Sequence, residues 1–425
     1  MESHKLRSLF TLPVIVAALG YFVDIYDLLL FSIVRRPSLL SLGIPEESLL
    51  AEGEFLLQMQ MGGMLVGGLV WGILGDKRGR LSVLFGSILV YSLANIANGF
   101  VTNMTQYAVL RFVGGFGLAG ELGAGVTLVA ETLSPKVRGY AITFIATFGL
   151  MGAVCANLVS KVVTDWQWNY FIGGGLGLVL LVLRVSVMES SIFLKSKVKE
   201  LSRGDFFQLF RKKSRFIKFA GCILIGLPIW YSIGILVTFS PEFAAALGVP
   251  GTVVVGDAVM YSYIGLAVGD LSSGVLSQIF VSRKKIVRFF ILLTLLFILL
   301  FLFSPVRTLP FFYFTCFMIG VGIGYWVLFV TIGAEQFGTN LRSTVTTSVP
   351  NFIRGTVVPL TLMFKFLREN LKTHFSGEMS PEDAKNKGLI LGALLVGVFT
   401  IVIAFIALRA IDETYGRDLN FEEED

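Results

Sequence analysis

Several charged side chains stand inside long apolar runs of this sequence, and these are the residues that could do chemistry. Asp24 and Asp27 lie in the first apolar run, and Arg111 begins a glycine-rich stretch in the fourth. Charge is costly in hydrocarbon, so ionisable groups there are usually functional. We predict that Asp27 carries a proton, that Arg111 pairs with it and favours its ionised form, and that Asp24 can share or replace this role. A permanent structural ion pair is the alternative.

A further carboxylate, Glu121, lies deeper in the fourth run. It is flanked by Gly120 and Gly123, whose lack of side chains permits close helix approach. It is expected to be either a second protonatable group or a polar contact for a substrate. The alternative is a satisfied hydrogen bond between helices.

The second half of the chain offers an arginine at a similar depth. Arg354 and Asp270 both fall near the middle of apolar runs, with Asn351 one helical turn from Arg354. A guanidinium can grip a carboxylate or phosphate through two parallel hydrogen bonds. We predict that Arg354 and Asn351 bind an anionic substrate group and that Asp270 is the counter-ion of Arg354 in the empty state. A purely structural pair is the alternative.

Aromatic residues are candidates for the wall of a substrate cavity. Tyr231, Tyr263 and Trp326 are the three that we expect to line it. The competing explanation is that they anchor helix ends at the membrane interface.

Composition identifies the environment of all these groups. Of 425 residues, 55% are apolar and 15% are charged, and the mean hydropathy is +0.78. A soluble domain carries roughly 25% charged residues, so this chain is expected to lie in a lipid bilayer. The net charge of +6 comes from short basic clusters between apolar runs, which argues against nucleic acid as a partner.

Twelve runs are long enough to span a bilayer, which takes about 20 apolar residues. They predict an all-α protein with six spans on each side of a basic linker. The spans are expected near 9–34, 56–75, 82–101, 106–130, 138–160, 167–187, 215–240, 258–281, 286–304, 309–333, 343–366 and 387–410. The corresponding units are an N-terminal bundle at 1–190, a cytoplasmic linker at 191–214, and a C-terminal bundle with a short acidic tail at 215–425.

Basic residues set the expected orientation. They cluster in the break between the halves, whereas 102–105 and 241–256 carry none. Because cytoplasmic loops are enriched in lysine and arginine, the break and both termini are expected in the cytoplasm. The segment 367–386 is an exception, since it is predicted outside yet carries basic residues. The compact loops favour a bacterial inner membrane.

The two halves repeat one motif at their inner ends. Glu131 and Arg138 recur as Glu335 and Arg342, seven residues apart in both cases. Such repeated halves are typical of transporters that work by alternating access. We predict a charge network that locks the inner gate, formed by Asp76, Arg80, Glu131, Arg138, Glu335 and Arg342.

Two stretches, Gly72 to Arg80 and Arg111 to Gly123, combine glycines with charged residues. The first is similar to the signature between helices 2 and 3 of the major facilitator superfamily, and the second resembles the fourth helix of its metabolite:proton symporters. The resemblance to this superfamily extends over nearly the whole length of the chain. Glu413 to Leu419 is similar to a sugar-porter motif, although the paired glutamines of the sugar porters are absent from 222–240. The resemblance implies two pseudo-symmetric six-helix bundles and secondary active transport.

The expected function is therefore proton-coupled import of a small polar or anionic metabolite by alternating access. An exporter or passive facilitator of a sugar, amino acid or metal chelate is the alternative, and a transport-derived receptor is a further one. No catalytic cluster, phosphate loop or metal-ligand spacing is found in the sequence, so no enzyme activity and no cofactor or metal are expected. The expected partners are the substrate, protons and the bilayer, with the chain as a monomer.

Overall fold

A computed structural model describes residues 12–78, 80–121, 135–189 and 206–416 of the chain. All regular elements in these ranges are helices, as expected from the sequence. The first half consists of α2 (Leu12–Ser41), η1 (Glu46–Ser48), α3 (Leu49–Arg78), α4 (Arg80–Asn98), α5 (Met104–Leu118), α7 (Pro135–Val162) and α8 (Trp166–Glu189).

The second half contains shorter and more often interrupted helices. These are α9 (Gln208–Arg211), α10 (Lys213–Leu224), α11 (Leu227–Tyr231), the π-helix η2 (Ser232–Val237), α12 (Ser240–Ala246), α13 (Val255–Ile279), α14 (Arg283–Phe303), α15 (Leu309–Gly322), α16 (Trp326–Glu335), α17 (Thr339–Gly355), α18 (Val357–Phe375) and α19 (Pro381–Ala410). The short helix α9 lies within the segment predicted to be a linker.

Nine helical stretches of the described chain are long and apolar enough to cross a membrane. The other predicted spans correspond to α4, to α5, and to α17 together with α18. The apolar part of α4, Val83–Asn98, is shorter than the nine. Many helices continue beyond the predicted apolar runs. The first runs to Ser41 instead of ending near 34, because its last turns remain packed inside the protein.

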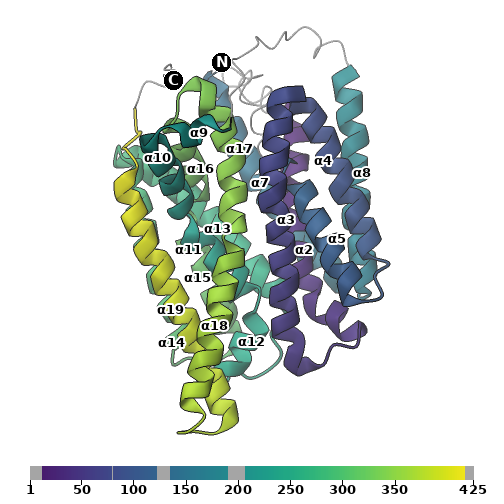
Figure 1. The fold of residues 1–425 in the computed structure, drawn as a ribbon, viewed down its shortest axis with the longest axis vertical. Helices are drawn as coiled ribbons and strands as arrows, with labels where there is room; N and C mark the ends of the chain where they lie inside the picture. Colours follow the sequence, from purple (N-terminus) through teal and green to yellow (C-terminus); the bar gives the residue numbers. More distant parts are fainter. Residues whose placement is uncertain (1–11, 79, 122–134, 190–205, 417–425) are drawn as a thin grey trace.

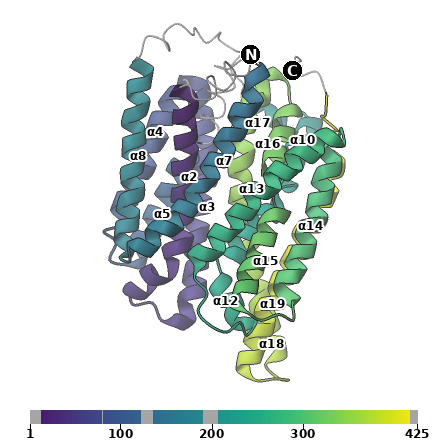
Figure 2. The same ribbon diagram turned by 180° about the vertical axis from the view of Figure 1, so that it is seen from behind.

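The helices form two groups that stand side by side (Figure 1). The first half packs through α2 with α7 and α3 with α5, and the second half through α13 with α15 and α18 with α19. The groups touch mainly where α7 meets α13 and where α3 meets α17. The view from behind shows α7 and α13 along this boundary (Figure 2).

The described chain begins and finishes at the same end of the bundle, which we call the inner end (Figure 1). The opposite end is called the outer end. The hairpin of α18 and α19 extends beyond the other helices there. Of the basic residues of 367–386, Lys372 and Lys385 are exposed on this hairpin, whereas Arg368 is buried against the first half.

Three predicted spans of the second half are interrupted midway. The first is divided among α10, α11 and η2, the next is broken between α15 and α16, and the last between α17 and α18. Gly324 in the second break lies against the backbone of Gly269, where an added Cβ would approach a backbone atom to 2.3 Å. Irregular backbone inside a membrane is tolerated where protein or a cavity covers it. These breaks surround the cavity described next.

Candidate functional site

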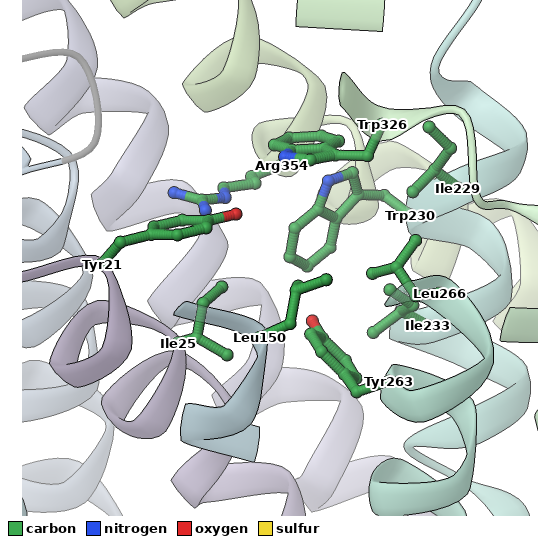
Figure 3. Close-up of a pocket in the computed structure, with 10 residues that line it drawn as sticks. All are labelled: Tyr21, Ile25, Leu150, Ile229, Trp230, Ile233, Tyr263, Leu266, Trp326 and Arg354. Carbon is green, nitrogen blue, oxygen red and sulfur yellow. The ribbon is translucent and has the colours of Figure 1, made fainter. Parts of the chain in front are cut away.

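A cavity lies between the two halves, near the middle of the bundle. Side chains of α2 and α7 line it from the first half, and side chains of α11, η2, α13, α16 and α17 from the second (Figure 3). Most of its wall is aliphatic or aromatic, which is the composition of a small-molecule site. The lining residues are Tyr21, Ile25, Leu150, Ile229, Trp230, Ile233, Tyr263, Leu266, Trp326 and Arg354.

Arg354 is the charged residue of this wall, and it is 1% exposed. Its guanidinium carbon lies 5.6 Å from the ring centroid of Trp230 and 5.9 Å from that of Trp326. Both distances are within the range of cation–π attraction. Its Nε and Nη1 have no hydrogen-bond partner among the described residues. The site therefore holds a buried cation with unused donors.

The counter-ion of Arg354 is Asp24 and not Asp270. Nη2 of Arg354 lies 3.7 Å from a carboxylate oxygen of Asp24, so the pair joins α17 to α2 across the two halves. This distance is too long for a hydrogen bond, and both Asp24 oxygens lack a hydrogen-bond partner in the described chain. The pair is loose enough for another anion to replace Asp24.

Asp270 instead supports the break between α15 and α16. Its carboxylate accepts a hydrogen bond of 3.1 Å from the backbone N–H of Val327, in the first turn of α16. A carboxylate at a helix N-terminus satisfies a free donor and interacts favourably with the helix dipole. The predicted pairing of Asp270 with Arg354 is therefore wrong, because the broken helix supplies a partner that the sequence pattern did not show.

Asp27 and Arg111 are both buried but form no salt bridge or hydrogen bond with each other within the described chain. Arg111 donates to the side-chain oxygen of Asn95 at 2.9 Å and lies 4.9 Å from the ring centroid of Tyr170. Both carboxylate oxygens of Asp27 lack a hydrogen-bond partner there. The expected direct contact is thus absent from this conformation, and Asn95 and Tyr170 hold the arginine.

Glu121 forms a buried ion pair with Arg184 of α8, a residue that the sequence analysis did not single out. Both guanidinium Nη atoms of Arg184 donate to the two carboxylate oxygens, one of them at 3.0 Å. Gly20 of α2 gives the pair its space, because a Cβ there would lie 2.1 Å from Arg184 Nη2. Glu121 is therefore a satisfied interhelical contact in this conformation.

Besides Asp270, two of the predicted substrate residues do not line the cavity. The Tyr231 hydroxyl donates to the carbonyl oxygen of Ala393 in α19, at 2.5 Å. Asn351 donates to the carbonyl oxygen of Ala119 in the first half, at 2.7 Å, and packs against Gly68. Both residues are positioned by helix packing, whereas Tyr263, Trp326 and Arg354 do line the cavity.

Ion pairs join the two halves at the outer end, and we call them the outer gate. They are Arg35 with Glu242 at 2.7 Å, Lys161 with Asp257 at 2.5 Å, and Glu54 with Arg368 at 2.7 Å. Each links a different pair of helices, namely α2 with α12, α7 with α13, and α3 with α18. The outer end is therefore closed in this structure. Sequence analysis missed these pairs because their partners lie between 96 and 314 positions apart, beyond any local pattern.

The inner end of the second half carries a separate polar network. Glu335 pairs with Arg283 at 2.7 Å and accepts a hydrogen bond from the Thr414 hydroxyl at 2.6 Å. Arg342 donates to the carbonyl oxygen of Ala334 at 3.0 Å. These contacts stay within the second half. Of the other predicted gate residues, Glu131 and the side chains of Asp76, Arg80 and Arg138 lie outside the described part of the chain.

No group of three potential metal ligands is found among the described residues. The polar groups that face the cavity are aromatic N–H and hydroxyl groups and one guanidinium. This donor-rich set suits an anion.

Comparison with known proteins places the fold in a family. The family model of the Major Facilitator Superfamily matches residues 18–355. The chain belongs to this superfamily. Among solved structures, that of the major facilitator proton:xylose symporter XylE superposes with a TM-score of 0.67 at 16% identity, covering 97% of this chain and 98% of that one. At this identity the likeness concerns the fold alone, and it agrees with two six-helix bundles.

Curated members of the superfamily match part of the chain. The putative niacin/nicotinamide transporter NiaP of Bacillus subtilis is 30% identical over 193 residues, 45% of this chain and 47% of that protein. The sialic acid transporter NanX of Escherichia coli is 27% identical over 266 residues, 61% of this chain and 62% of that protein. The matched stretches thus span about half of these relatives. Together they support a membrane transporter of small metabolites.

Proposed function

We propose that this chain imports a small carboxylate metabolite together with protons by alternating access. The observation that carries the proposal is Arg354, a buried guanidinium with two unused donors at a cavity between the two halves. An unpaired polar group at such a depth is unfavourable unless a ligand completes its hydrogen bonds. A carboxylate can accept two parallel hydrogen bonds from a guanidinium.

The cavity wall favours an aromatic acid over a highly hydroxylated one. Aliphatic side chains and indole rings form most of the wall, so numerous substrate hydroxyls would lose hydration without gaining partners. The relatives are named for niacin or nicotinamide and for sialic acid, and of these niacin and sialic acid are carboxylates at neutral pH. The indole rings of Trp230 and Trp326 meet edge to face, with centroids 6.4 Å apart, and offer aromatic surface against which the flat ring of an aromatic acid can pack.

The substrate carboxylate and Asp24 would compete for Arg354, and this competition would couple substrate binding to proton binding. A bound carboxylate takes the place of Asp24 beside the guanidinium. Asp24 then loses its counter-ion in a buried site, which favours its protonated form. Asp27, one turn further along α2 and also without a hydrogen-bond partner in the described chain, is the second proton carrier. As the halves move, Arg111 would approach Asp27 and favour its ionised form, or move away and allow it to be protonated.

The gates would alternate during the cycle. The outer gate must separate before substrate can enter from outside, while contacts at the inner end close. We propose that Glu335 and Arg342, with Asp76, Arg80, Glu131 and Arg138, form the inner lock. The protein would act as a monomer in a bacterial inner membrane with both termini in the cytoplasm.

The test uses purified protein in energised proteoliposomes. External pH is recorded while aromatic acids, sialic acid, amino acids, sugars and iron chelators are added in turn. Alkalinisation with one carboxylate, lost in Asp27→Asn and kept in the exposed control Asp383→Asn, is the expected result. Entry of a compound without proton movement would support a passive facilitator. Loss of a preloaded compound driven by a proton gradient would support an exporter.

A further inference from the structure

Tyr263 carries a hydroxyl group that the protein leaves without a partner. The residue lies on α13, is 2% exposed, and lines the cavity. Its hydroxyl points into the cavity (Figure 3) and makes no hydrogen bond to any described residue. The side chains around it there are Leu150, Ile233 and Leu266, which cannot supply one.

The cavity has a polar side and an apolar side. Arg354 and the Trp230 indole, whose Nε1 also lacks a partner in the described chain, lie together on one side. The Tyr263 hydroxyl lies on the other side, with Leu150 between them (Figure 3). A rigid ligand held by Arg354 would therefore extend along aliphatic wall toward this hydroxyl.

We propose that Tyr263 selects substrates that carry a hydrogen-bonding group on the ring opposite the carboxylate, such as a phenolic hydroxyl or a ring nitrogen. This inference rests on the proposed function, because it assumes that a carboxylate occupies Arg354. A phenol can donate or accept, so either kind of substituent can complete the contact.

An unsubstituted ring should bind more weakly because it would exclude water from the Tyr263 hydroxyl without giving it a hydrogen-bond partner. An unsubstituted ring would cover this hydroxyl with carbon, whereas a polar substituent pairs with it. Sites that hydrogen-bond a substrate group discriminate strongly against analogues that lack the group. A single neutral hydrogen bond corresponds to about a tenfold difference in apparent affinity.

Uptake of benzoate, 4-hydroxybenzoate and isonicotinate by full-length protein in proteoliposomes tests the inference. The wild type is expected to take up the two substituted acids with KM values about tenfold lower than that for benzoate. Tyr263→Phe should abolish the preference, because the substituted acids lose their hydrogen bond and benzoate no longer covers an unpaired hydroxyl. The KM values of the two substituted acids should rise and that of benzoate should fall. Tyr261→Phe is the matched control, because Tyr261 lies two positions away on α13, is 40% exposed and stacks on Tyr313 outside the cavity.

The outcomes separate the two proposals. Uptake of benzoate with equal KM values for all three acids, or an unchanged preference in Tyr263→Phe, would overturn the selection by Tyr263 and leave carboxylate transport standing. Uptake of another carboxylate but of none of these three acids by the wild type would overturn the selection by Tyr263 alone, and uptake of no carboxylate at all would overturn both. The ligand-free Tyr263→Phe protein should unfold at the same temperature as the wild type, since the hydroxyl faces the cavity and bonds no described residue.

Discussion

Arg354 shows how a single residue combines stability and binding. Its charge is balanced at 3.7 Å by Asp24 and screened by two indole faces, but its Nε and Nη1 are not used by the described protein. Burial of a charge without full hydrogen bonding is unfavourable. The unused donors of Arg354 therefore favour the binding of an added anion. A lysine ammonium lacks the planar pair of donors with which a guanidinium binds an anion.

Arg354→Lys is expected to raise KM for the transported carboxylate by about 100-fold, because the ammonium keeps the charge but loses the planar fork. Initial rates of uptake into proteoliposomes measure the change. Arg36→Lys is the control, since Arg36 is one-third exposed at the outer end and pairs at 3.5 Å with Glu242. Equal KM values for the wild type and Arg354→Lys would contradict the assigned role.

At the scale of elements, the second half places residues of the cavity wall at breaks in helices. The break between α15 and α16 presents the Val327 N–H to Asp270 and brings Trp326 to the cavity. It depends on close contact between Gly324 and Gly269, at which no side chain fits.

Gly324→Ala should displace α16 from α13, because its Cβ would lie 2.3 Å from the Cα of Gly269. Backbone cannot yield as a flexible side chain can, so we expect a loss of several degrees in Tm together with loss of transport. Thermal unfolding in detergent and uptake assays report the two effects. Gly72→Ala is the comparison, since an added Cβ there meets no atom within 4 Å. Similar behaviour of the two variants would argue against the close contact.

A second element-scale contact holds the segment after α19 against the start of α14. Glu413 accepts hydrogen bonds from the Ser282 hydroxyl and from the backbone N–H groups of Arg283 and Lys284. Burial alone would raise the pKa of this carboxyl, but these hydrogen bonds outweigh it and hold the pKa below its ordinary value of 4.5. A lowered pKa means that the contact stabilises the fold above the ordinary pKa and is lost as the pH falls through the folded one.

Glu413→Gln is therefore expected to lower the free energy of unfolding by about 1 kcal/mol at pH 7, as for loss of a helix cap. The difference from the wild type should shrink as the pH falls below about 4. Thermal unfolding at several pH values tests both statements. A difference that grows toward low pH would show that the carboxylate is not the stabilising form.

At the scale of the whole molecule, the outer gate holds the two halves in one of their arrangements. Arg35 and Glu54 are buried and reach across the boundary between the halves. Removing one partner of a buried ion pair costs about 3 to 5 kcal/mol, because the other charge stays behind. The gate should therefore influence which end of the molecule is open.

Glu54→Gln is expected to shift the population toward the outward-open state. The reporter is Ile233→Cys at the cavity, in a protein whose three native cysteines are replaced. A membrane-impermeant thiol reagent added from outside should label this cysteine severalfold faster with Glu54→Gln than without it. Glu369→Gln is a close control, because Glu369 pairs with the same Arg368 at 3.1 Å but is half-exposed and belongs to the same helix. Equal labelling in both backgrounds would exclude Glu54 from the gate.

The membrane architecture and several cavity residues can be recognised from the amino-acid sequence. Apolar runs of about 20 residues can only be spanning helices, so the all-α membrane fold followed from composition. Buried charge is rare enough that Arg354 and Asp24 could be recognised from their positions alone. Tyr263 and Trp326 were predicted to line the cavity because they are amphipathic aromatic residues within spans. The same argument predicted Tyr231, whose hydroxyl instead bonds Ala393.

The pairing of the charged residues, in contrast, depends on how the helices pack. Asp24 reaches Arg354 across the two halves, Arg184 takes Glu121, and the outer gate joins helices that are far apart in sequence. Asp270 serves a helix break that hydropathy does not reveal. The physical reason is that hydropathy depends on the local sequence, whereas a Coulomb or hydrogen-bond partner is set by packing in three dimensions.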